Sequence, residues 1–113
     1  MEGSLSNYIS IHRRRAGISQ RELGKILGYT KVTVFRHEHV AALPPLLAAL
    51  RYEALFLTPV GTLFAGMREA IEDEIEQRLD ELEAELQHGS SQHSRKQTLE
   101  WIAARRTALV SRR

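Results

Sequence analysis

Three polar side chains between positions 31 and 36 are of the types that hydrogen-bond to the edges of DNA bases. They are Lys31, Thr33 and Arg36. Lysine and arginine donate to the acceptors of guanine, and a threonine hydroxyl can donate or accept. In a helix these three residues occupy the first two turns, which meet base edges when a helix lies in a major groove. The chemistry that they predict is reversible binding of double-stranded DNA.

Four further residues are candidates for contacts with the DNA phosphates: Gln20, Arg21, Thr30 and His39. Gln20 and Arg21 open the preceding helical pattern, where polar side chains and free backbone amides can hold a phosphate. Thr30 and His39 stand at the two ends of the helix that carries the base-contact candidates. We expect these residues to support affinity for all sequences alike.

Two short helical patterns must position these side chains. Ser19 is suited to be an N-cap, with Glu22 three residues later to complete a capping box, and Gly28 is suited to end that first helix in a left-handed conformation. Thr30 is suited to cap the second helix. The apolar residues of the two patterns are Leu23, Ile26, Leu27, Val32, Val34 and Phe35. Two such helices around a glycine turn have the proportions of a helix-turn-helix, although an ordinary helical hairpin with solvated basic residues has the same spacing.

This stretch resembles the Cro/C1-type (XRE-like) family of helix-turn-helix regulators. The family pattern reads S/T-Q-x-x-L-A-x-x-L-G, a small apolar residue, S/T, and then I/V-S-x-x-E. The matching residues are Ser19, Gln20, Leu23, Leu27, Gly28, Thr30, Val34 and Glu38. The resemblance extends from Leu5 to Met67, because LSNYISIHRRRAG and RYEALFLTPVGTLFAGM are similar to the helices on either side.

The resemblance implies a five-helix domain and a sequence-specific transcriptional regulator of bacterial, phage or plasmid type, with repression as the expected effect. It also implies a structural ion pair between Arg13 and Glu38, because many relatives pair residues at these positions. The chain departs from the family at Gly24, where alanine is usual. It also lacks the glycine-containing loop that follows Glu38 in relatives, so the third helix can continue another turn until Pro44 ends it.

Helical periodicity elsewhere makes the predicted fold class all-α. We expect a helix-turn-helix DNA-binding domain at 1–66, a long acidic amphipathic helix at 67–88, and a linker with a short helical or disordered basic tail at 89–113. The stretch from His88 to Gln97, HGSSQHSRKQ, has the composition of that linker. The first helix is expected from about residue 4 or 5 to 16, and the fifth opens with Thr58 as its cap. The expected buried stripe of the fourth helix is Leu46, Leu47, Leu50, Ala54 and Leu55.

Charge is segregated along the chain. Residues 1–60 carry eight Lys/Arg and four Asp/Glu, residues 61–88 carry two and nine, and residues 89–113 carry six and one, giving net charges of +4, −7 and +5. A basic front block is typical of a nucleic-acid-binding domain. The acidic block taken alone is better explained as a solvated helix surface.

The acidic helix also carries a regular apolar stripe. Its dimerisation candidates are Ile71, Ile75, Leu79, Leu82 and Leu86. With Met67 they follow steps of 4, 4, 4, 3 and 4, a wider stripe than a strict coiled-coil seam, so packing on the chain's own domain and pairing with a second subunit both remain open.

Composition narrows the remaining functions. The chain has no cysteine, and no pattern of catalytic or metal-binding residues or of cofactor binding is found, so we expect no enzyme, metal or cofactor. No apolar run suits a signal peptide or membrane span, so a cytoplasmic location is expected. The expected partners are double-stranded DNA and a second copy of the chain. The alternative is an antitoxin-like or adaptor protein whose C-terminal helices bind another protein, with DNA binding secondary.

Overall fold

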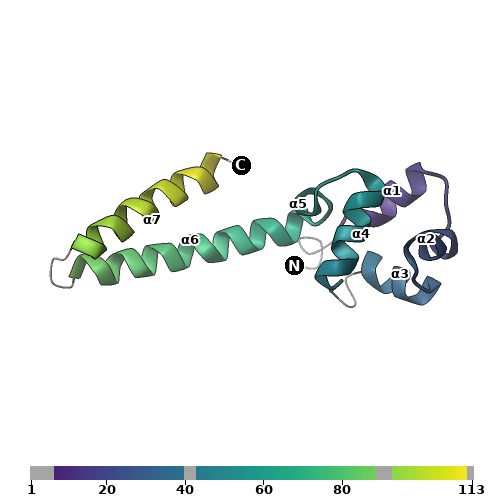
Figure 1. Ribbon diagram of the computed structural model, residues 1–113, viewed down its shortest axis with the longest axis horizontal. Helices are drawn as coiled ribbons and strands as arrows, with labels where there is room; N and C mark the ends of the chain where they lie inside the picture. Colours follow the sequence, from purple (N-terminus) through teal and green to yellow (C-terminus); the bar gives the residue numbers. More distant parts are fainter. Residues whose placement is uncertain (1–6, 40–42, 89–92, 112–113) are drawn as a thin grey trace. The chain divides into compact units, whose positions relative to one another are not determined.

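The computed structural model describes residues 7–39, 43–88 and 93–111, and its regular elements in these ranges are all helices (Figure 1). They are α1 (Ile9–Arg15), α2 (Gln20–Leu27), α3 (Lys31–Glu38), α4 (Leu46–Phe56), α5 (Val60–Leu63), α6 (Ala65–His88) and α7 (His93–Ser111). The predicted all-α class with a long C-terminal helix is confirmed. Contacts divide the chain into two compact units, Met1–Arg68 and Glu69–Arg113. None of the helices in the described ranges is long and apolar enough to cross a membrane.

Helix α1 begins at Ile9, several residues later than expected, because Asn7 organises the chain ahead of it. The Asn7 side-chain oxygen accepts a hydrogen bond from the Ile9 amide at 2.9 Å, and the Tyr8 amide donates to the carbonyl of Leu63 at 2.9 Å. These contacts satisfy amides that a longer helix would have used internally. Leu5, which was expected to open the helix, lies outside the described residues.

The local signals around α2 and α3 are confirmed. The Ser19 hydroxyl accepts from the Glu22 amide at 3.0 Å and the Glu22 carboxylate accepts from the Ser19 amide at 2.8 Å, which completes the capping box. Gly28 has a φ of 84°, a left-handed conformation that favours glycine. The Thr30 hydroxyl caps α3 by accepting from the Thr33 amide at 3.1 Å. Local hydrogen bonds therefore fix both ends of α2 and the start of α3.

The expected extra turn of α3 does not reach Pro44. The helix ends at Glu38 with His39 as its cap, and residues 43–45 are not helical. The consecutive prolines explain why residues 43 and 44 are not helical, because a proline disfavours helical geometry in the residue before it. Val40, Ala41 and Ala42, the centre of that expectation, lie outside the described residues.

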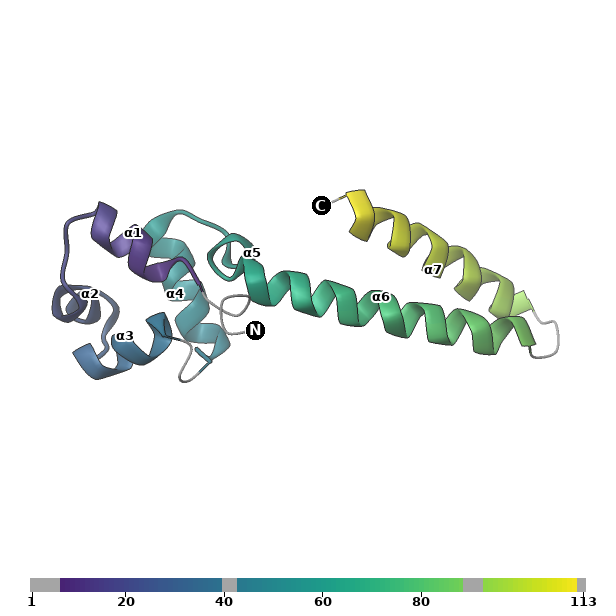
Figure 2. The same ribbon diagram turned by 180° about the vertical axis from the view of Figure 1, so that it is seen from behind.

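The first unit packs α1 to α5 around one core (Figure 2). Its buried residues are Ile9, Leu23, Val34, Ala48, Ala49, Tyr52, Leu63 and Phe64. The expected stripe of α4 was wrong for its three N-terminal leucines: Leu46, Leu47 and Leu50 are 73%, 60% and 46% exposed, whereas Leu55 packs partly buried against the core. The buried residues of α4 are instead Ala48, Ala49 and Tyr52. Helix α5 begins at Val60 with Pro59, instead of Thr58, as its cap.

The second unit is a helical hairpin of α6 and α7. Leu79 of α6 is buried against Ile102 and Leu109 of α7, with Leu86 at the edge of this cluster. Arg106 of α7 donates to Asp80 at 2.6 Å and to Glu83 at 3.2 Å on α6. The expected linker was therefore too long, because residues 93–97 already belong to α7. Arg112 and Arg113 lie outside the described residues.

Candidate nucleic-acid interface

Helix α3 presents one face to solvent and one to the core. Its exposed residues, with the cap, are Lys31, Val32, Phe35, Arg36 and His39. These positions recur at alternating steps of one and three residues, which places them along one side of a helix. Val34, His37 and Glu38 are buried on the opposite side. The exposed side is a surface of two cations, two apolar groups and an imidazole.

The base-contact candidates differ in their exposure. Lys31 and Arg36 are exposed. Thr33 is only partly exposed, and its hydroxyl lies 3.0 Å from that of Thr30 while its amide donates to the same oxygen. Thr33 is thus engaged in the cap of its own helix, and Lys31 and Arg36 are the more accessible donors.

Sequence reasoning named Val32 and Phe35 only as apolar residues of this helix and did not identify them as surface residues. They are 59% and 48% exposed. The signal was present in the spacing, because residues two apart on a helix differ by about 200° and cannot share one face. The Phe35 ring is stacked on His39, with centroids 4.0 Å apart, and His39 Nδ1 lies 2.8 Å from the carbonyl of Phe35. The two rings therefore pack on each other at the C-terminal end of α3.

The phosphate-contact candidates also differ in their exposure to solvent. Arg21 is exposed on the first turn of α2, and the cap residue Thr30 is exposed as well. Gln20 is partly buried, and its side-chain amide donates to Glu38 at 2.9 Å. The Ser19 amide that binds Glu22 lowers the pKa of that carboxyl, so the acid beside Arg21 is held in the capping box. Gln20 therefore positions α2 against α3, whereas Arg21 is accessible to solvent.

Arg13 and Glu38 form an ion pair that joins the three N-terminal helices. Arg13 Nε lies 2.6 Å from one carboxylate oxygen of Glu38, and Arg13 Nη2 lies 3.3 Å from the other. Arg13 also donates to the carbonyl of Ile18 at 3.0 Å, and Gln20 donates to Glu38. The Glu38 side chain is only 1% exposed. Contacts from α1 and α2 thus converge on the last turn of α3.

A second buried contact anchors α3 from behind. His37 Nδ1 lies 2.8 Å from the Tyr52 hydroxyl of α4, and Asn7 donates to the carbonyl of His37 at 2.7 Å. Burial lowers the pKa of His37 and raises that of Tyr52, so both side chains are favoured in their neutral forms. The exposed side of α3 is therefore presented by a helix that is held at several points.

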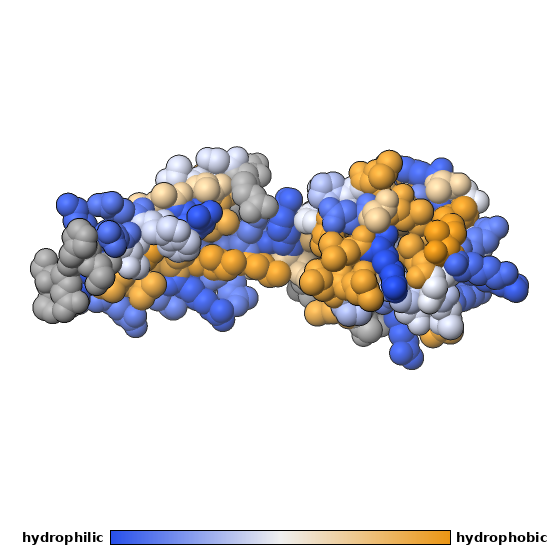
Figure 3. Space-filling model, viewed as in Figure 1, coloured by the Kyte–Doolittle hydropathy of each residue, from blue (hydrophilic) through white to orange (hydrophobic). Residues whose placement is uncertain are grey.

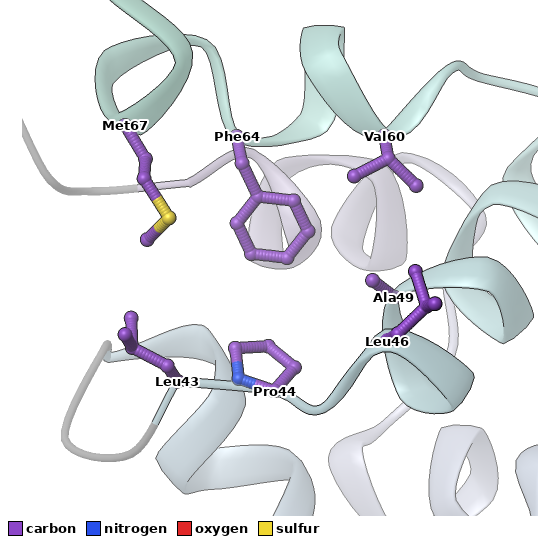
Figure 4. A pocket seen from close by; sticks show the side chains of 7 residues that line it. All are labelled: Leu43, Pro44, Leu46, Ala49, Val60, Phe64 and Met67. Carbon is purple, nitrogen blue, oxygen red and sulfur yellow. The ribbon is translucent and has the colours of Figure 1, made fainter. Parts of the chain in front are cut away.

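A pocket of about 250 Å³ lies on another part of the first unit (Figure 4). Its lining residues are Leu43, Pro44, Leu46, Ala49, Val60, Phe64 and Met67. Figure 4 shows the side chains of Met67, Phe64 and Val60 on one side and those of Leu43 and Pro44 on the other. Because these side chains are apolar, the pocket suits a hydrophobic group and offers no acid or base. Within the described ranges, no group of three His, Cys, Asp or Glu residues could hold a metal ion.

Comparison with protein-family models, with curated proteins and with solved structures finds no match for this chain.

Proposed function

We propose that the chain is a sequence-specific DNA-binding transcriptional regulator of the Cro/C1 type, in which α2 and α3 form the helix-turn-helix. The observation that carries the proposal is the exposed side of α3, where Lys31 and Arg36 point to solvent from a helix anchored by Glu38 and His37. A rigid helix with accessible donors is what major-groove reading requires. The net charge of +4 over residues 1–60 supports an approach to phosphate.

Lys31 and Arg36 are proposed to bind base edges, with Thr33 contributing only after some release from its cap. Arginine and lysine bind the O6 and N7 acceptors of guanine. Arg21, Thr30 and His39 are proposed to contact phosphates. Gln20 is proposed to act on phosphate through its backbone amide at the start of α2, because its side-chain amide binds Glu38.

Val32 and Phe35 extend the proposed reading surface. An apolar side chain in the major groove can contact the methyl group of thymine, which no other base presents there. Val32 and Phe35 are 59% and 48% exposed, so both are accessible to such a methyl group. A preference for thymine beside a guanine is therefore expected in the bound sequence.

The regulator is proposed to act as a homodimer and to repress. Paired helices read two half-sites about 34 Å apart, one turn of duplex, so an element outside α3 has to hold two copies together. The five candidates for that element divide in the hairpin: Leu79 and Leu86 pack with α7, whereas Ile71, Ile75 and Leu82 are exposed.

Selection of bound duplexes from a random pool, at physiological salt, tests this function. The wild-type protein should enrich two related half-sites. Arg36→Ala should bind that consensus about 5- to 150-fold more weakly, which corresponds to about 1 to 3 kcal/mol, and should lose preference at one position of each half-site.

The matched control is Arg14→Ala, which removes an exposed arginine from α1 and leaves α3 intact. It should retain the wild-type consensus. Equal weakening on every sequence by Arg36→Ala would reassign that residue to phosphate. The absence of any enriched sequence with the wild-type protein would reject the function.

A second function, an adaptor that binds another protein through its C-terminal helices, is favoured by the exposed Ile71, Ile75 and Leu82 of α6. Capture of one stoichiometric heterologous partner, together with no duplex preference, would support it over the first.

A further inference from the structure

The apolar stripe of α6 is only half covered by α7. Leu79 is 9% exposed, whereas Ile71, Ile75 and Leu82 are 48%, 41% and 39% exposed. With 3.6 residues per turn, these three side chains lie within about 40° of one another and about 40° to 80° from Leu79. Figure 3 shows a band of hydrophobic residues along α6. An exposed apolar line of this kind is the usual mark of a protein contact.

Helix α7 adds an aromatic residue to the same face. Trp101 is 54% exposed, and the guanidinium of Arg105 lies 5.0 Å from its ring centroid. Around the axis of α7, Trp101 lies about 100° from the buried Ile102. The rotation has the same sense as the one that separates Ile71, Ile75 and Leu82 from the buried Leu79 on α6. In an antiparallel pair of right-handed helices, side chains displaced in the same sense lie on the same side. The residues Ile71, Ile75, Leu82 and Trp101 are named the open face.

The hairpin has a small core of its own. The second unit, Glu69–Arg113, has three buried apolar residues with Leu86 at their edge. A domain of this size rarely gains enough stability from one small cluster, and association is a common remedy. Two helical hairpins that stack their apolar faces form a four-helix bundle.

Charge identifies the occupant of the open face. Helix α6 carries nine Asp/Glu and two Lys/Arg, a net charge of −7, and α7 carries four Lys/Arg and one Glu, a net charge of +3. Within one copy Arg106 already binds Asp80 and Glu83 of α6. A second hairpin brings the same two charges, so α6 of each copy can lie against α7 of the other. Pairing of α6 with α6 would oppose two strongly acidic helices.

We propose that the open face binds the open face of a second copy of this chain, forming an antiparallel four-helix bundle in which α6 contacts α7 of the partner. The two-fold axis then runs parallel to the helices, and both copies of α6 begin at the same end of the bundle. The inference deepens the proposed function by naming its dimer interface, and the self-association itself does not depend on DNA.

Sedimentation of the full chain tests the interface. The double variant Ile75→Glu/Leu82→Glu should raise the dimer dissociation constant at least about a hundredfold, because two carboxylates would be buried against apolar groups. The matched control is Val110→Glu, since Val110 is 57% exposed on the opposite flank of α7. It should remain a dimer. A dimeric double variant, or a wild-type chain that is monomeric at high concentration, would overturn the proposal.

Cysteine cross-linking tests the pairing without disturbing the open face, and the chain has no cysteine of its own. Arg78→Cys on α6 and Ala108→Cys on α7 lie at the flank of that face. A disulfide should form when the two variants are mixed and not within either alone. A disulfide within Arg78→Cys alone would show α6 against α6 and overturn the arrangement.

The two proposals can fail separately. If Ile75→Glu/Leu82→Glu abolishes the dimer while the wild-type protein shows no duplex preference, the interface is upheld and the DNA-binding function is rejected. A sequence-specific protein whose double variant remains dimeric would do the reverse. Circular dichroism of the double variant should show unchanged helix content, and the cross-link provides the answer if that variant does not fold.

Discussion

Replacement of Arg13 by methionine should lower the stability of the first unit by about 3 to 5 kcal/mol, the usual cost of leaving one member of a buried ion pair alone. The Glu38 carboxylate is 1% exposed and would keep only the hydrogen bond from Gln20, at 2.9 Å, among its present contacts. Methionine retains most of the apolar stem of Arg13, so the effect reports the guanidinium and not a cavity.

Removal of both charges should cost less than the two single changes together. Arg13→Met combined with Glu38→Met buries no unpaired carboxylate. We expect the double variant to lose about 1 to 2 kcal/mol of stability, because the carbonyl of Ile18 and the side-chain amide of Gln20 lose their hydrogen-bond partners. Because Arg13→Met alone should cost about 3 kcal/mol or more, the double variant should be at least about 1 kcal/mol more stable than the sum of the two single changes predicts.

Urea unfolding followed by far-ultraviolet circular dichroism measures these free energies. The chain has one tryptophan, Trp101, which lies in the second unit, so its fluorescence provides an internal control. The Trp101 transition should stay in place while the transition of the first unit moves. A coupling energy below about 0.5 kcal/mol would refute the structural role assigned to the pair.

Three further outcomes are expected. Arg21→Ala should reduce the slope of log affinity against log salt by about 0.9, one phosphate contact, and an unchanged slope in a salt titration would exclude that contact. Gly24→Ala should destabilise the first unit by about 1 to 3 kcal/mol in urea unfolding, because a Cβ at this position would collide with the backbone carbonyl of Tyr29. This cost should exceed the gain from the better helix propensity of alanine. A stabilised variant would contradict the close approach of Gly24 to Tyr29. Burial lowers the pKa of His37 in the folded state, so its stabilising effect should be complete above its ordinary pKa of about 6.5 and decline as the pH falls below it. His37→Gln should flatten this decline in thermal unfolding between pH 7 and 5, and an equally steep decline would assign it to other groups.

The α2–α3 region could be predicted closely because its signals are local. The capping box at Ser19, the left-handed Gly28 and the cap at Thr30 each satisfy backbone groups within three or four residues. No distant contact has to be known for these to form. The residues of the candidate site were placed on the correct helix for the same reason.

The exposed and buried faces depended on contacts that the sequence does not specify. Helix α4 is apolar nearly all round, so periodicity could not decide between its leucines and the face of Ala48, Ala49 and Tyr52. The bond between Tyr52 and His37 settles the choice, and it joins residues 15 positions apart.

The second unit differed from expectation because of packing between its two helices. The composition of residues 88–97 favours a linker, yet α7 begins at His93. Burial of Ile102 and Leu109 on α6 stabilises a helix that weak local propensity would not have extended so far. The same packing divides the five dimerisation candidates, which a helical wheel alone places on one stripe.

The central claim is tested most directly by competition between a selected consensus duplex and a scrambled duplex of equal length and composition, at physiological salt. Specific binders exceed their non-specific affinity by about 10³-fold or more. We expect a ratio of at least this size for the wild-type chain, and a much smaller ratio when Lys31 and Arg36 are both alanine. A ratio near one for the wild-type chain, whatever its absolute affinity, would contradict the assignment of α3 as a sequence-reading helix.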